Sequence, residues 1–182
     1  MTFEGKVSAW IPYSVGTLWN YAIQFEDILN AFTLKDFIFY REDLNTLLDR
    51  LDDPAVCGFS TYVWNNNYCL IAAEKIKKKW PNCKIVFGGP QINESYLSHS
   101  FIDSIILDEG EEAFVEFLRK VKNGETNDRI IKKKRMQELN YSGPYSGGVF
   151  DSLIDQYPQF VWNMTLETNR GCPYSCTFCD WG

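Results

Sequence analysis

A strand–helix–strand pattern between residues 55 and 87 constrains the fold more than any other feature of this sequence. Ala55–Val63 has the β-branched and aromatic content of a buried strand, and Lys84–Phe87 is a second apolar run. Between them an apolar stripe recurs at helical spacing, formed by Cys69, Ala72, Ala73, Ile76 and Trp80. Lysines favour the C-terminal end of this helix and Pro81 stops it. The pattern predicts two strands joined by a packed helix.

The same alternation extends over residues 1–122. Further strands are expected at Lys6–Ile11, Phe37–Tyr40 and Ile105–Leu107, and further helices at Leu18–Phe32, Leu44–Leu51 and Glu111–Val121. Alternation with short connections predicts an α/β fold, a doubly wound parallel sheet of Rossmann-like type. The loops after the strands then meet at one edge, where open α/β sheets bind ligands. These loops are Pro12–Gly16, Ser60–Asn67, Gly88–Gln91 and Asp108–Glu112.

The composition changes after residue 122. Residues 123–158 hold four glycines and a basic run, which is typical of a linker with at most one short exposed strand. A new strand, Phe160–Leu166, then leads into a cysteine-rich loop. We therefore expect a Rossmann-like domain over 1–122, a linker over 123–158 and the start of a second, incomplete domain over 159–182. Because that strand has no predicted neighbour, the tail is expected either to be poorly ordered or to pack back on the first domain.

Three of the six cysteines, Cys172, Cys176 and Cys179, have the spacing C-x3-C-x2-C. Three thiolates in one loop can hold three corners of a cubane iron–sulfur cluster and leave the fourth iron open. A structural zinc site needs four ligands, and the sole histidine, His99, lies far away in the sequence. A ferredoxin-type cluster needs a fourth cysteine nearby, and a disulfide is unexpected in a reducing compartment.

A strand followed by Gly-Cys-Pro-Tyr-x-Cys-x-Phe-Cys resembles the first strand and loop of the radical S-adenosylmethionine (SAM) superfamily. The resemblance implies a partial barrel of which this chain carries only the first strand and the cluster loop. It also implies a [4Fe–4S] cluster on Cys172, Cys176 and Cys179, with SAM chelating the open iron and Phe178 near its adenine. An electron from a reductant such as flavodoxin or ferredoxin would cleave SAM to a 5′-deoxyadenosyl radical.

The first 122 residues resemble the cobalamin (B12)-binding domain that precedes the barrel in some members of that superfamily. Three segments are similar. They are the loop after the third strand (Ser60, Thr61, Tyr62), a glycine pair followed by proline (Gly88, Gly89, Pro90), and a helix start resembling Gly-Glu-Gly-Glu that contains Gly110. In the last, Asp108 replaces the first glycine. The Asp-x-His-x-x-Gly loop with an axial histidine is absent. The resemblance therefore leaves two alternatives, cobalamin bound without a histidine ligand and a domain that keeps the fold but not the cofactor.

Charge and hydropathy limit the other functions that this sequence could have. The net charge of −6 predicts no nucleic-acid partner, and no apolar run reaches the roughly 20 residues of a membrane span. The N-terminus lacks the layout of a signal peptide, so a cytoplasmic location is expected. The acidic residues Asp108, Glu109, Glu111 and Glu112 are interpreted as favouring the positive end of a helix rather than as metal ligands.

Three interpretations follow. The first is the N-terminal portion of a B12-type radical SAM enzyme, with binding sites for small-molecule cofactors and a second chain or downstream segment completing the barrel. The second is a non-catalytic module that binds cobalamin or another ligand and carries a vestigial cysteine tail. The third is a nonfunctional remnant with a stable fold. The first explains the most features, although this chain alone is not expected to be catalytically complete.

Overall fold

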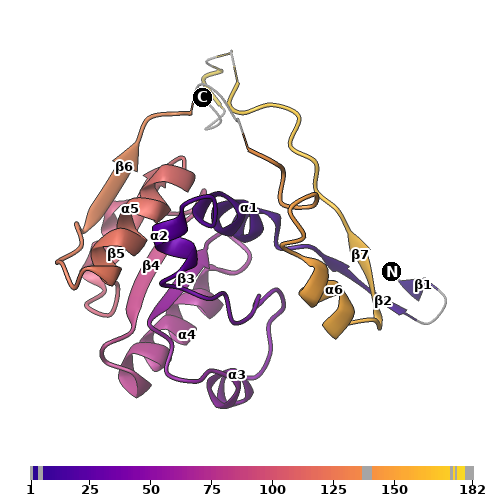
Figure 1. Ribbon diagram of the computed structural model, residues 1–182, viewed down its shortest axis with the longest axis horizontal. Coiled ribbons are helices and arrows are strands. Elements are labelled where there is room, and N and C mark those ends of the chain that lie inside the picture. Colours follow the sequence, from indigo (N-terminus) through magenta and orange to yellow (C-terminus); the bar gives the residue numbers. More distant parts are fainter. Residues whose placement is uncertain (1, 4–5, 137–140, 173, 175, 179–182) are drawn as a thin grey trace.

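The strands form two separate sheets in the computed structural model, which describes residues 2–3, 6–136, 141–172, 174 and 176–178 (Figure 1). The larger sheet has four strands in the order β3 (Val56–Ser60), β4 (Lys84–Gly88), β5 (Ser104–Asp108) and β6 (Ile130–Lys133). All three neighbouring pairs are parallel. This sheet and its helices confirm the predicted α/β, Rossmann-like fold class, and we call them the body.

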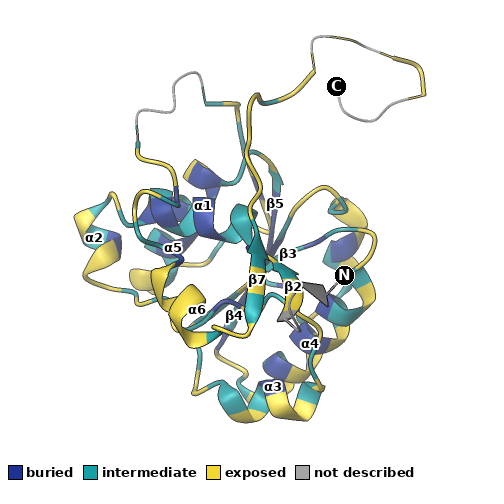
Figure 2. Cartoon of the chain, turned by 90° about the vertical axis from the view of Figure 1, so that its right-hand side faces the viewer, coloured by how far each residue is buried: buried dark blue, intermediate teal, exposed yellow. Residues whose placement is uncertain are grey.

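Helices cover both faces of the four-stranded sheet. One layer contains α3 (Leu44–Arg50), α4 (Asn66–Lys79) and the 3-10 helix η1 (Glu94–Ser98). The other contains α1 (Tyr13–Ala22), α2 (Glu26–Leu29) and α5 (Glu111–Lys122). Successive side chains of β4 point to opposite faces of the sheet, so Ile85 and Phe87 pack with α4 whereas Val86 packs with α5. Burying each such side chain contributes about 1.5–3 kcal/mol, so this sandwich dominates the core (Figure 2).

The smaller sheet contains β1 (Thr2–Phe3), β2 (Lys6–Trp10) and β7 (Phe160–Asn163), with α6 (Asp151–Gln156) beside it (Figure 1). The expectation that Lys6–Ile11 joins the main sheet is wrong, because β2 pairs in parallel with β7. The strand at Phe160 therefore has a neighbour and packs back on the first part of the chain. As a further consequence β3 is an edge strand that is only half-buried, not the buried strand that its composition indicated.

Other expected elements differ in detail. Residues 37–40 form no strand, and Phe37 instead packs with Ile11, Phe150 and Leu153 in a small apolar cluster. The helix expected over Leu18–Phe32 consists of α1 and α2 separated by a turn. Within residues 123–158 the structure contains β6, whose Ile131 is buried in the main sheet, and α6. In the ranges that the structure describes, no helix has the length and apolar character of a membrane span.

Candidate functional site

The loops after β3 and β4 meet at the carboxyl edge of the sheet. Ser60 lies opposite Gly88 in the strand register, and the Thr61 backbone N–H donates to the Gly88 carbonyl at 2.8 Å. The Gln91 N–H donates in turn to the Thr61 carbonyl at 3.2 Å. The structure therefore brings together two of the predicted segments, Ser60–Tyr62 and Gly88–Pro90.

The close contact between the two loops requires glycine at position 89. Its φ of +102° lies in the region that favours glycine, and an added Cβ would lie 2.7 Å from the Thr61 carbonyl oxygen. At Gly88 an added Cβ would make only ordinary contacts, 3.8 Å from Ile106. The absent side chain of Gly89 thus accommodates the protein's own backbone rather than leaving room for a ligand.

The β3 loop carries an unpaired buried hydroxyl and an exposed aromatic ring at this edge. Thr61 is fully buried, and its Oγ1 has no hydrogen-bond partner among the described residues. Leaving a buried hydroxyl unpaired costs about 1–3 kcal/mol, so Thr61 Oγ1 is a group that a ligand or water would satisfy. Tyr62 stacks on Trp64 with ring centroids 4.7 Å apart, and Trp64 is 68% exposed. Sequence reasoning missed Trp64, which lies two positions beyond Tyr62, the end of the segment that carried the resemblance.

A groove of about 570 Å³ lies along the same edge. Its lining residues come from the loop after β4 and from the ends of β5 and β6: Gly89, Pro90, Ile92, Asn93, Glu94, Leu107, Asp108 and Lys132. Two of the predicted residues, Gly89 and Pro90, therefore border an open space large enough for part of a bulky cofactor. Gly110 faces elsewhere, because an added Cβ there would lie 2.8 Å from Leu18 of α1.

The turn between β5 and α5 explains the departure from the Gly-Glu-Gly-Glu pattern. Asp108 has a φ of +63°, a conformation that glycine adopts freely and that aspartate tolerates better than most residues. Gly110 then forms the N-cap of α5. A glycine in place of Asp108 would suit the same turn, so the resemblance at this position has a conformational basis.

The cysteine loop differs chemically from the cysteines of the body. Cys172 and Cys176 are exposed and free, whereas burial raises the pKa of the Cys69 thiol to about 11. Exposure leaves Cys172 and Cys176 accessible to a metal, which the buried Cys69 is not. Cys179, the third predicted ligand, lies outside the described residues, and among those that are described no group of three potential ligands occurs. Phe178 is 90% exposed.

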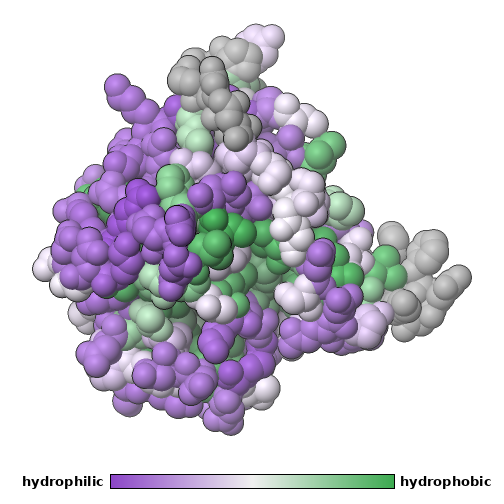
Figure 3. Space-filling model, viewed as in Figure 1, coloured by the Kyte–Doolittle hydropathy of each residue, from purple (hydrophilic) through white to green (hydrophobic). Residues whose placement is uncertain are grey.

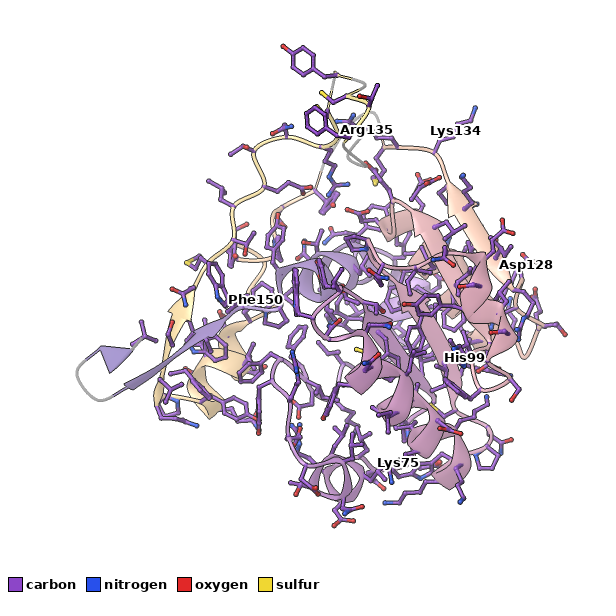
Figure 4. All side chains as sticks on the ribbon, turned by 180° about the vertical axis from the view of Figure 1, so that it is seen from behind. Lys75, His99, Asp128, Lys134, Arg135 and Phe150 are labelled. Carbon is purple, nitrogen blue, oxygen red and sulfur yellow. The ribbon has the colours of Figure 1, made fainter. Side chains whose placement is uncertain are left out.

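Arg170, just before the cysteine loop, connects this segment to the body. Its Nη2 lies 2.6 Å from Glu111 Oε1, and its Nη1 lies 3.3 Å from Glu109 Oε2. The two glutamates, which we expected to act on the helix end, therefore also form ion pairs. His99, which is labelled in Figure 4, packs against the rings of Tyr96 and Phe101 and is not among the residues that line the groove.

Comparison with known proteins identifies relatives that span nearly the whole chain. The chain is 31% identical to the cobalamin-dependent radical SAM methyltransferase TokK of Streptomyces tokunonensis, over 94% of this chain and 28% of that protein. It is 28% identical, with the same coverage, to the 2-(S-pantetheinyl)-carbapenam-3-carboxylate methyltransferase of Streptantibioticus cattleyicolor. An uncharacterized methyltransferase of Synechocystis is 31% identical over 59% of this chain and 19% of its own length. No family model matches the chain.

The chain thus spans about a quarter to a third of the length of the first two relatives. Over that span it is similar to TokK, whose name carries both features that the sequence motifs indicated, cobalamin dependence and the radical SAM superfamily. The predicted resemblance of this chain to radical SAM superfamily proteins of the cobalamin-binding type is thereby confirmed.

Proposed function

We propose that this chain is the part of a B12-type radical SAM enzyme that binds a [4Fe–4S] cluster through Cys172, Cys176 and Cys179. The observation that carries the proposal is the loop with two exposed, free thiols that follows β7 and is tied to a Rossmann-like body. When bound, such a cluster would supply the electron for the reductive cleavage of SAM to a 5′-deoxyadenosyl radical. A reductant of the flavodoxin or ferredoxin type would deliver that electron.

The residues of the chain divide into two groups in this proposal. The cysteine loop would bind the cluster, and the exposed ring of Phe178 would cover the adenine of SAM. The edge formed by Ser60–Tyr62 and Gly88–Pro90, with the adjoining groove, would bind cobalamin. The barrel strands that complete the enzyme and bind its substrate would come from a downstream segment or a second chain.

Methyl transfer is the reaction class that we infer for the completed enzyme. The two relatives with the widest coverage are both methyltransferases, and one of them carries cobalamin dependence in its name. Because the chain spans only 28% of either relative, its substrate does not follow from theirs.

Anaerobic reconstitution with iron and sulfide tests the cluster site. The wild-type chain should hold about four irons and four sulfides, with the broad visible absorption of a cubane cluster. Cys176→Ala should lose most of both, whereas Cys69→Ala, a matched control in α4, should retain them because that thiol is buried. Equal iron in all three proteins would contradict the proposal.

The second candidate function is a cobalamin-binding module without a working cluster, which the unpaired Thr61 hydroxyl favours. A cobalamin titration followed by absorption separates the two functions when it is repeated on the Cys172/Cys176/Cys179→Ala variant. Thr61→Val keeps the shape of the side chain, so it should leave folding intact while weakening cobalamin binding about tenfold. Cobalamin binding without iron incorporation would favour the module, and no cobalamin binding by any of these proteins would exclude it.

A further inference from the structure

The segment that carries the cysteines is attached to the body through a nearly buried guanidinium. The Arg170 side chain is 13% exposed and the Glu111 side chain 6% exposed, and they contact at 2.6 Å. Glu109 contacts Arg170 from the same turn at 3.3 Å, and Glu167 contacts it from within the tail at 3.1 Å. A charge-assisted contact shielded from water is only weakly screened by salt, so this attachment is of a different kind from a surface ion pair.

Glu109 and Glu111 also hold a second stretch of chain. The Met136 N–H donates to Glu109 Oε2 at 2.8 Å, and the Tyr141 hydroxyl donates to Glu111 Oε1 at 3.2 Å. Gly171, with a φ of +71°, packs so closely that an added Cβ would lie 2.9 Å from Arg135 Nη1. Figure 4 shows Arg135 beside the segment that carries the cysteines. The two glutamates are thus the common anchor of the tail and of the chain that leaves β6.

The anchor lies at the edge of the sheet where the predicted ligand loops meet. Glu109 and Glu111 flank the start of α5, directly after β5, and β5 is parallel to β4. The carboxyl ends of parallel strands share one edge, so the anchor and the Gly88–Pro90 loop lie on the same side of the body. Only Gly171 separates Arg170 from Cys172 in the sequence, so fixing Arg170 keeps Cys172 close to the anchor.

We propose that Arg170 is a positioning residue: held by Glu109 and Glu111, it fixes the cysteine loop against the start of α5 and so sets the cluster site beside the ligand edge of the body. This inference deepens the proposed function and rests on it for the identity of the cluster. The attachment itself is a property of the cluster-free chain and is measurable without any cofactor.

Hydrogen exchange measured by mass spectrometry on the cluster-free, full-length chain tests the attachment. Arg170→Ala and Glu111→Gln should each raise exchange about tenfold or more at the Thr165 amide, which donates to the Tyr145 hydroxyl, and at the Met136 amide, which donates to Glu109. The double variant should exceed neither single variant. Glu167→Gln is the matched control, since it removes a partner within the tail but leaves the link to the body, and it should change exchange less than threefold. Arg170→Lys should restore part of the protection.

Peptides from β4 and β5 distinguish positioning from general destabilisation, because their exchange should stay at the wild-type level in every variant. If Arg170→Ala fails to fold, Arg170→Lys and Glu111→Gln carry the comparison. Unchanged exchange in Glu111→Gln, or an equal increase in Glu167→Gln, would overturn the proposal. Failure of the wild-type chain to take up iron while the predicted exchange pattern holds would instead refute the proposed function and leave the positioning role standing.

Discussion

Apart from the two-residue β1, the body and the three-stranded sheet are built from strands of similar length, yet they are stabilised differently. In the body, β4 and β5 lie between helices on both faces, and Ile85, Phe87 and Ile105 are fully buried. In the smaller sheet, Val7 and Trp10 of β2 are largely exposed, and beyond β7 the tail is held to the body by Arg170. In Figure 3 hydrophilic residues cover much of the surface, while hydrophobic residues gather near α1 and toward the smaller sheet. The body therefore has extensive apolar clusters of its own, whereas the tail depends on a few specific contacts.

Matched phenylalanine truncations should show this difference most strongly. Phe87→Ala removes a fully buried ring that packs between the sheet and α4, and it should cost about 3–5 kcal/mol of unfolding free energy. Phe160→Ala removes a half-buried ring that packs on Phe39 and Trp162 and should cost about 1–2 kcal/mol. Urea unfolding followed by circular dichroism measures both values. A larger loss at Phe160 would reverse the comparison.

The contact between Gly16 of α1 and Phe150, which joins the body to the smaller sheet, should not tolerate added side-chain volume. An added Cβ at Gly16 of α1 would lie 2.0 Å from Cζ of the buried Phe150, just before α6 (Figure 4). Gly16→Ala should therefore cost about 1–3 kcal/mol through displacement of that ring. Gly143→Ala is the control, because nothing lies within 4 Å of its added Cβ and the stability should scarcely change. A thermal unfolding midpoint for Gly16→Ala equal to that of the control would show that Gly16 and Phe150 are not tightly packed.

The smallest expected effect is a titration at the anchor of the tail. Burial, and then the charge of Glu111, raise the pKa of Tyr141 from 10.0 to about 12. The folded chain therefore keeps a proton that the unfolded chain loses, so this tyrosine's contribution to stability is complete below pH 10 and declines as the pH rises toward 12. Ultraviolet difference titration against Tyr141→Phe measures the pKa, and Glu111→Gln should lower it toward 10.0. An unshifted tyrosine would indicate that the anchor is open in solution.

The elements that the sequence predicted well are those defined by local pattern. The stripe on α4 and the acidic start and apolar face of α5 belong to single helices, and both helices formed close to the expected bounds. The meeting of Ser60–Tyr62 with Gly88–Pro90 followed from parallel strands alone. The positive φ of Asp108 gives a physical reason for a motif position that resemblance had marked.

The elements that the sequence did not predict depend on partners far away in the chain. The pairing of β2 with β7 joins segments about 150 residues apart, and no periodicity within either strand selects that partner. Phe37 became buried without a strand because Phe150 and Ile11 offered an apolar site. Arg170 adjoins the cysteine motif, but its role required Glu109 and Glu111, which sequence reasoning had assigned only to the helix end.

The central claim is that the cysteine loop of this chain is a working cluster site, and electron paramagnetic resonance of the reconstituted, reduced protein tests it most directly. Spectra with and without SAM should show a [4Fe–4S] signal that shifts when SAM is added and is lost in the Cys172/Cys176/Cys179→Ala variant. A cluster signal that SAM leaves unchanged, or no signal above that of the variant, would contradict the claim.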